Sequence, residues 1–266
     1  MTATLICIGL GFGTGIILAL TGAGGTILAV PLLMLGLNLT VVEAAPIGLL
    51  AVSLAAGIGA SIALIQGKVR YRAAGYLAII GSIASPLGIM IAQYLPNVLL
   101  TALFAILLTS IAWHYFRMSS VKLPTPSEHF AVPCQLDDAS GRLVWNAPCF
   151  RALTISGLTA GFLSGLLGVG GGVIINPALK KISNLSLQTI LGTTLAVVAL
   201  ISMVGVISAM MISAIRWPIA IPFISSTIAG MLLGRYLTRY ITESCSQQLF
   251  ALLAGCIAIG ILFQMV

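Results

Sequence analysis

Residues 161–172 read Gly-Phe-Leu-Ser-Gly-Leu-Leu-Gly-Val-Gly-Gly-Gly, a stretch in which a run of glycines interrupts an otherwise apolar segment. A related run, Gly22-Ala23-Gly24-Gly25, lies 146 residues earlier, and the same offset pairs Arg70 with Arg216 without a gap. The chain is therefore a duplication in which each half carries one glycine-broken segment. This pattern is typical of transporters whose substrate site lies at the interface between two repeats.

The composition places the chain in a membrane. Apolar residues make up 59% of the sequence and charged residues only 6%, whereas soluble domains carry roughly 25% charged residues. Apolar runs of about 18 or more residues are long enough to cross the hydrocarbon core as helices. The sequence thus predicts an all-α polytopic membrane protein in contact with the lipid bilayer. The net charge of +7 is interpreted as a topology signal and not as nucleic-acid binding.

The chain divides into two membrane repeats, 1–117 and 150–266, joined by a polar linker at 118–149. The linker is long enough for a small hairpin but too short for a separate folded domain. Helices are predicted near 3–20, 24–37, 44–66, 73–94 and 97–117 in the first repeat, and near 151–167, 170–182, 187–213, 217–240 and 246–265 in the second.

The second segment of each repeat is too short to span a bilayer. As helices, 24–37 and 170–182 reach only about 20 Å, and each directly follows glycines. Each repeat is therefore predicted to begin with a glycine-broken helical hairpin, followed by three spans. Non-helical backbone at membrane depth is tolerated only where it is buried in protein or lines a cavity.

The basic residues predict the topology. If each hairpin returns to its own side, Arg216 stands alone on one face, and eleven basic residues share the other: Lys68, Arg70, Arg72, Arg117, Lys122, Arg142, Arg151, Lys180, Lys181, Arg235 and Arg239. The positive-inside rule places this basic face in the cytoplasm. The two halves are then inverted repeats, with both termini outside and the linker inside.

The glycine turns are the predicted anion site. A helix that begins at Gly24 or Gly170 points free backbone N–H groups and a partial positive charge into the membrane interior, and glycine lets an anion approach them closely. The predicted ligating residues are Gly22, Gly24, Gly25, Thr26, Gly168, Gly170, Gly171 and Gly172. The alternative is close helix packing, the role assigned to small-residue faces such as Gly157-x3-Gly161.

Four further side chains are candidates for the same site. Thr193 and Thr194 lie early in the helix after the second hairpin, where their hydroxyls can face the site or bond back to their own helix. Arg70 and Arg216 occupy equivalent positions, and an arginine there can bind an oxyanion through its forked donors or anchor the chain at the membrane interface.

Other chemistry has little support in the sequence. Glu43 is the one carboxylate near a predicted span, but Thr40-x-x-Glu43 matches a capping box, which is favoured over a proton-carrying role. The five cysteines form no C-x-x-C motif and predict neither a disulfide framework nor a metal site. Enzyme motifs such as Walker A, H-E-x-x-H and G-x-S-x-G are missing from the sequence, so neither an enzyme nor a cofactor is predicted.

The glycine motif at 161–172, with Pro177 and the following Gly192-Thr193-Thr194, resembles the TauE/SafE sulfite exporter family of membrane permeases. The resemblance covers both halves but not the linker. It implies a secondary transporter that exports small sulfur-containing anions, such as sulfite or organosulfonates, across a bacterial inner membrane. The first half departs from the family pattern, because Thr26 replaces the third glycine and Pro46-Ile47-Gly48 replaces the glycine-threonine element.

Two other classes remain open at this stage. A membrane thiol-redox enzyme would pass electrons through intramembrane cysteines, and Cys7 and Cys256 lie in predicted spans, but not at repeat-equivalent positions. An assembly protein without transport activity is the third reading. A homo-oligomer is possible in each case.

Overall fold

The computed structural model describes residues 2–22, 24–37, 39–120, 134, 136–137, 142–143, 146–183, 185–211, 215–238 and 243–265. Within these ranges the first half contains helices α1 (Thr2–Thr21), α2 (Gly24–Leu37), α3 (Val41–Ile65), α4 (Tyr71–Tyr94) and α5 (Asn97–Ser120). The second half contains α6 (Ala147–Leu167), α7 (Gly172–Ile182), α8 (Leu187–Met210), α9 (Trp217–Leu237) and α10 (Glu243–Met265). Two short strands of the linker, β1 (Leu136–Asp137) and β2 (Arg142–Leu143), pair antiparallel.

The predicted fold class is confirmed. Every predicted helix is present, and six helices in the described ranges are long and apolar enough to cross a membrane. The largest differences are at the linker, where α5 continues to Ser120 and α6 begins at Ala147. Both helices therefore extend into the range that the sequence assigned to the linker.

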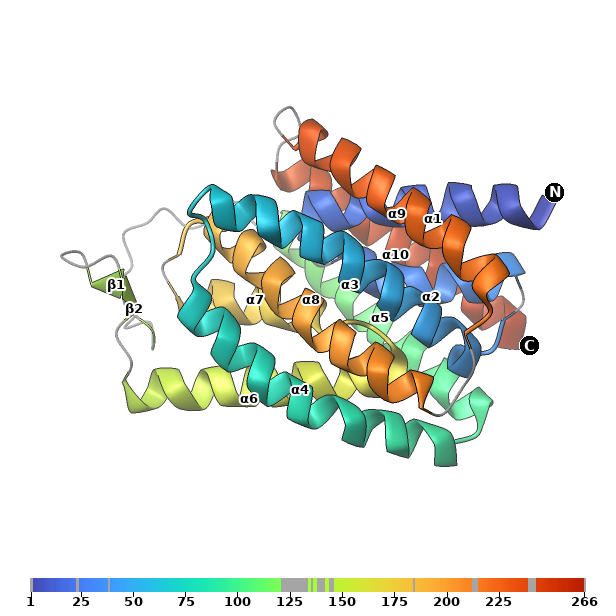
Figure 1. The fold of residues 1–266 in the computed structure, drawn as a ribbon, viewed down its shortest axis with the longest axis horizontal. Coiled ribbons are helices and arrows are strands. Elements are labelled where there is room, and N and C mark those ends of the chain that lie inside the picture. The colour runs from blue at the N-terminus through green and yellow to red at the C-terminus, as the bar shows by residue number, and fades with distance from the viewer. Residues whose placement is uncertain are drawn as a thin grey trace.

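The helices pack in pairs that follow the duplication. Helix α1 packs along α9, its repeat-equivalent α6 packs along α4, and α3 and α8 pack against each other between these pairs (Figure 1). Small residues allow the close approach: a Cβ on Gly161 would collide with the backbone of Gly81, and one on Gly15 with the backbone of Thr227. Such contacts are the usual way in which membrane helices associate.

The two ends of the helix bundle differ. The β1–β2 hairpin lies at one end, here called the linker end, and both chain termini lie at the other, the termini end (Figure 1). Helices α3, α7 and α9 end at the linker end, where α4, α6 and α8 begin. Of the eleven basic residues predicted to share a face, Lys122 and Arg239 lie outside the described residues.

The short helix α2 lies in the interior of the bundle. Most of its residues are buried, including Ile27, Leu28, Ala29 and Val30. A helix that is apolar on all sides, as α2 is, suits a protein core or a lipid environment, and the burial of α2 places it in the core. The buried position of α2 brings the first glycine turn to the centre of the molecule.

Candidate functional site

The first hairpin turns at Gly22, which has a φ of +70°. Thr21 ends α1, and its hydroxyl donates to the Ile17 carbonyl at 2.7 Å and accepts the Gly24 N–H at 2.6 Å. Gly24, Gly25 and Thr26 are all buried at the start of α2. The Thr21 hydroxyl therefore satisfies one of the free N–H groups with which α2 begins.

The second hairpin has a longer unwound turn. Gly168, Gly170 and Gly171 all have φ near +70°, a conformation that residues with a Cβ rarely adopt. Because Gly170 and Gly171 are left-handed, α7 begins at Gly172 and not at Gly170 as predicted. In the described ranges the N–H groups of Gly170, Gly171 and Gly172 have no hydrogen-bond partner. The buried start of α7 thus presents free donors.

The two hairpins meet at these turns. A Cβ built on Gly170 would stand 3.2 Å from Thr26 Cβ in the first hairpin and 3.0 Å from Ser202 Oγ in α8. A second contact joins the hairpins where Asn176 Nδ2 of α7 donates to the Thr21 carbonyl at 3.1 Å. The predicted glycine segments of the two halves are therefore neighbours, and no side chain separates them at Gly170.

Several hydroxyls around the junction have no partner. Ser85, Ser164, Thr194 and Ser202 are fully buried, and each hydroxyl lacks a hydrogen bond in the described structure. Hydroxyls in apolar helices usually bond back to a carbonyl of the preceding turn, as Ser156 does to Ala152 at 2.7 Å. Sequence reasoning missed the three serines. Ser164 lies inside the 161–172 motif, but no local pattern marks Ser85 or Ser202.

Thr193 and Arg70, two other predicted site residues, differ in whether their side-chain donors already have hydrogen-bond partners. Thr193 Oγ1 donates to the Thr189 carbonyl at 2.7 Å and accepts the Arg70 N–H at 3.1 Å. It follows the alternative interpretation, a hydroxyl bonded to its own helix, while Thr194 does not. Arg70 precedes α4, and its Nε is buried without a partner among the described residues.

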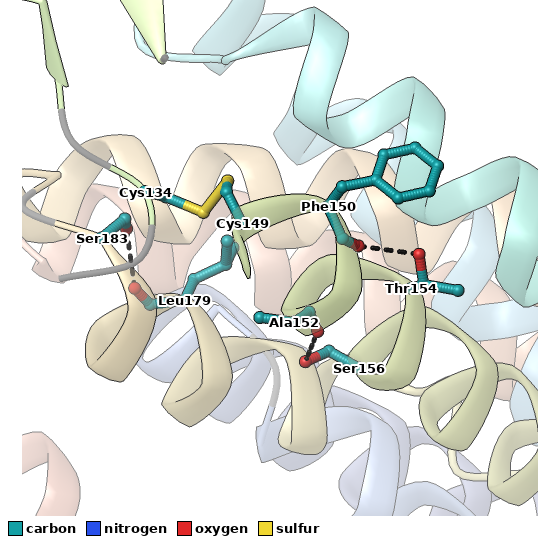
Figure 2. The surroundings of a disulfide bond; sticks show 8 residues. All are labelled: Cys134, Cys149, Phe150, Ala152, Thr154, Ser156, Leu179 and Ser183. Atoms are coloured by element: carbon teal, nitrogen blue, oxygen red, sulfur yellow. Dashed lines mark hydrogen bonds between the residues drawn. A yellow bond between two sulfur atoms is a disulfide. The ribbon is translucent and has the colours of Figure 1, made fainter. Parts of the chain in front are cut away.

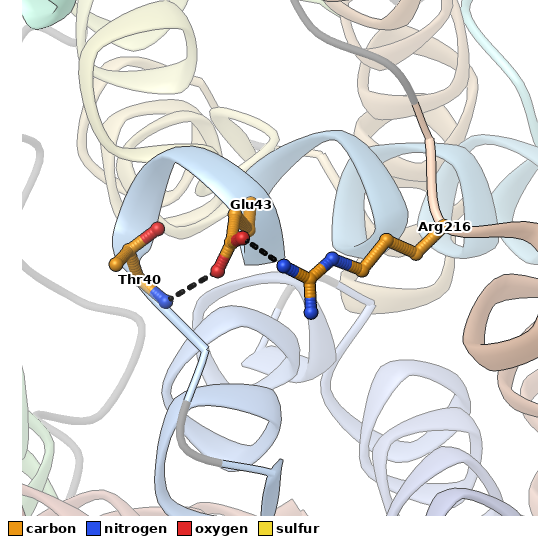
Figure 3. A network of polar contacts seen from close by, with 3 residues as sticks. All are labelled: Thr40, Glu43 and Arg216. Atoms are coloured by element: carbon orange, nitrogen blue, oxygen red, sulfur yellow. Dashed lines mark hydrogen bonds and ion pairs between the residues drawn. The ribbon is translucent and has the colours of Figure 1, made fainter.

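Arg216 lies at the termini end. Its guanidinium forms an ion pair with Glu43, with 2.5 Å between Nη2 and Oε1 (Figure 3). The other oxygen of Glu43 accepts the Thr40 N–H at 3.2 Å. The predicted capping role of Glu43 is confirmed, and the ion pair is an additional role that the sequence spacing of 173 residues concealed.

A cavity of about 350 Å³ opens at the linker end. Three cationic residues line it, Lys68, Lys180 and Arg235, and no aspartate or glutamate is among its described lining residues. The remaining polar lining consists of carboxamides and hydroxyls: Gln66, Asn176, Gln188, Gln247, Thr21, Thr238 and Ser246. We call this space the basic cavity.

The basic cavity reaches the hairpin junction. Thr21 and Asn176, which hydrogen-bond each other across the two hairpins, are both lining residues. None of the twelve predicted ligating residues lines the cavity itself. The sequence pattern thus located the hairpin turns but not the charged space beside them, because its lining comes from six segments that are distant in the chain.

The prediction about cysteines was wrong. Cys134 of the linker and Cys149 at the start of α6 form a disulfide, with 4.9 Å between their Cα atoms (Figure 2). The Cys134 N–H also donates to the Ile182 carbonyl at 2.9 Å, so the linker is attached to the end of α7. The two cysteines are 15 residues apart in sequence. They come together because the linker turns back between them at the β1–β2 hairpin, which their spacing alone does not reveal. Cys7 and Cys256, the residues of the thiol-redox reading, are free thiols.

Comparison with known proteins gives concordant results. The profile of the family described as "Sulfite exporter TauE/SafE" matches residues 7–261. A "Probable membrane transporter protein" of Xylella fastidiosa (strain 9a5c) is 28% identical over 98% of this chain and 95% of its own length. The "Probable membrane transporter protein YunE" of Bacillus subtilis (strain 168) is 25% identical over 86% of each chain. No solved structure matches.

Proposed function

Because the chain belongs to the TauE/SafE sulfite exporter family, we propose that it exports small sulfur-containing anions of the sulfite or organosulfonate class. The six apolar spans found in the described part of the chain, together with its relatives, identify it as a multi-pass bacterial membrane transporter. The substrate class and the direction of transport are the proposed part.

The basic cavity is the observation that carries the anion assignment. Lys68, Lys180 and Arg235 bring three positive charges to a space whose described lining contains no aspartate or glutamate. The four carboxamides of the lining add N–H donors. Such a surface attracts anions and repels cations, and the attraction is strengthened by the low-dielectric walls.

From the cavity, the anion would enter the hairpin junction. The free N–H groups of Gly170, Gly171 and Gly172 and the hydroxyl of Ser202 are donors without described partners there, and Thr194 of the same helix as Ser202 has another unused hydroxyl. Gly168, Gly22, Gly24 and Gly25 keep side chains out of the turns, and Thr26 contacts Gly170. Arg70 and Thr193 would act at the entrance, next to Lys68. Helix N-termini and glycine turns of this kind are common anion sites.

Export needs no acidic relay under this proposal. An anion that leaves a cell with a negative interior gains about 2.3 kcal/mol per charge at 100 mV. Glu43, at the start of α3, serves as a cap and an ion-pair partner. The membrane potential can therefore drive export without a coupling ion.

Two neighbouring lysines of α7 provide the test. Lys180 lines the basic cavity, whereas Lys181 is exposed and does not. We expect Lys180→Gln to reduce the flux of sulfite or sulfoacetate from proteoliposomes about tenfold, the effect of losing one charged hydrogen bond. Lys181→Gln should transport like the wild type.

Ligand binding is measured in parallel by thermal shift against sulfite, thiosulfate, sulfoacetate and sulfate, because a ligand that binds the folded state raises its melting temperature. If none of the four anions stabilises the protein or crosses the proteoliposome membrane, the proposed substrate class is wrong. Equal loss in the two lysine variants would mean that the basic cavity is not the entrance.

A further inference from the structure

One ion pair joins the two halves at the termini end. Glu43 lies in the first turn of α3, and Arg216 immediately precedes α9. Their ion pair ties a helix of the first repeat to a helix of the second (Figure 3). This end of the bundle holds an apolar cleft of about 40 Å³, lined by residues that include Ala45 and Gly165.

The duplication places an equivalent contact at the linker end. The offset of 146 residues carries Arg216 onto Arg70 and Glu43 onto Thr189. The equivalent helices do meet there, since the Arg70 N–H donates to Thr193 Oγ1 of α8 at 3.1 Å. Thr189 offers no carboxylate, however, and its hydroxyl shares a hydrogen bond with Ser186 at 2.8 Å. The buried Nε of Arg70 is left without a partner in the described structure.

The two ends therefore differ in the presence of this ion pair and in the size of the cavity found there. The end with the Glu43–Arg216 pair has an apolar cleft of about 40 Å³, whereas the end that lacks the equivalent pair opens into the basic cavity of about 350 Å³. Building on the proposed transport function, we propose that the Glu43–Arg216 ion pair is a latch that holds the termini end closed. It would break when the bundle opens toward that end.

The strength of the pair suits a latch that must open in every cycle. The side chains of Arg216 and Glu43 are 56% and 35% exposed. An ion pair at this exposure shifts an equilibrium by roughly two- to fivefold. The ion pair favours the conformation in which the termini end is closed, but it is weak enough for the bundle to open. A reversible conformational equilibrium requires an effect of this size.

Cysteine accessibility measures this equilibrium directly. Ala45 lines the apolar cleft and contacts Gly168 of the second hairpin turn, so Ala45→Cys reports water access at the termini end. Gln188→Cys in the basic cavity reports access at the linker end. Each reporter is placed in full-length protein with Cys7, Cys245 and Cys256 replaced by alanine, and its alkylation rate is measured in detergent, where both ends are accessible.

We expect Glu43→Gln and Arg216→Gln to raise the alkylation rate at position 45 about two- to fivefold and to lower the rate at position 188. Glu43→Gln can still accept the Thr40 N–H, so it removes the ion pair and not the cap. The matched control is Thr40→Ala, which keeps the pair and should leave both rates unchanged. The charge swap Glu43→Arg with Arg216→Glu should restore the original rates.

Thr189→Glu tests the other end. It supplies the missing carboxylate opposite Arg70 and should lower the alkylation rate at position 188. If the two single variants fold, as judged by gel filtration and melting temperature, and leave the position 45 rate unchanged, the latch is refuted. The alkylation result does not depend on which anion is transported, so a wrong substrate class and a wrong latch give different outcomes.

Discussion

At the residue scale, Ser202 combines full burial with an unused hydroxyl. Its Oγ lies beside Gly170 and has no hydrogen-bond partner in the described structure. An unpaired polar group in an apolar interior costs free energy, so the hydroxyl is expected to have a use other than stabilising the fold. Donation to a bound anion is such a use, because a hydroxyl adds a donor without adding a charge.

Ser202→Ala should therefore weaken transport without weakening the fold. We expect the apparent affinity for the anion to fall about tenfold, the effect of one lost hydrogen bond to a charged group. The melting temperature should stay the same or rise, since no bond within the protein is lost. Ser156→Ala is the control, because the Ser156 hydroxyl already bonds to Ala152. Normal transport by Ser202→Ala would remove Ser202 from the site.

At the element scale, glycine contacts set the distance between helices. Gly161 of α6 is in contact with the backbone of Gly81 in α4, and Gly165 with the backbone of Ser85. These glycines have helical conformations, so their role is packing. The glycines of the second turn differ in kind, because their positive φ values fix the backbone conformation there. One motif, 161–172, thus contains both a packing face and a candidate binding turn.

Gly161→Ala should destabilise the protein by about 1–3 kcal/mol, as expected for an extra methyl group forced into a closely packed interface. Gly75→Ala in α4 is the matched control, because a Cβ there has open space around it, and alanine favours a helix more than glycine does. Thermal unfolding in detergent compares the two. An unchanged melting temperature for Gly161→Ala would show that α4 and α6 can separate without cost.

At the scale of the whole molecule, two features give opposite indications of orientation. The eleven basic residues favour a cytoplasmic linker end. The Cys134–Cys149 disulfide lies at the same end, and disulfides persist mainly in oxidising compartments. We give more weight to the eleven charges than to one bond, so we expect the linker end to face the cytoplasm and the disulfide to be reversible in the cell.

A single cysteine decides the orientation. Gln66→Cys, exposed at the linker end, is placed in a variant without the native cysteines. We expect an impermeant thiol reagent to label it only after the inner membrane is permeabilised. Labelling of intact cells would place the linker end outside, make Cys134–Cys149 a structural disulfide and turn the basic cavity toward the outside.

The sequence alone was sufficient for the class, the helices and the hairpins. Apolar runs predict membrane helices because bilayer thickness fixes the length of a span. Glycine runs mark the turns because few other residues adopt a positive φ. Asp, Asn, Ser and Thr before a helix mark its start, and on that basis Thr40 and Glu43 were assigned to a cap. All of these signals are local in the chain.

Only the tertiary structure brought distant residues together. The basic cavity collects Lys68, Lys180 and Arg235 from the ends of helices that are far apart in sequence. The Glu43–Arg216 pair joins residues 173 positions apart, and the Cys134–Cys149 bond depends on the path of the linker. No local pattern encodes these contacts, because each depends on how separate segments pack together and not on the conformation of any one of them. The sequence by itself determined where this chain turns inside the membrane, and the packing of its two halves decided which charges and hydroxyls surround those turns.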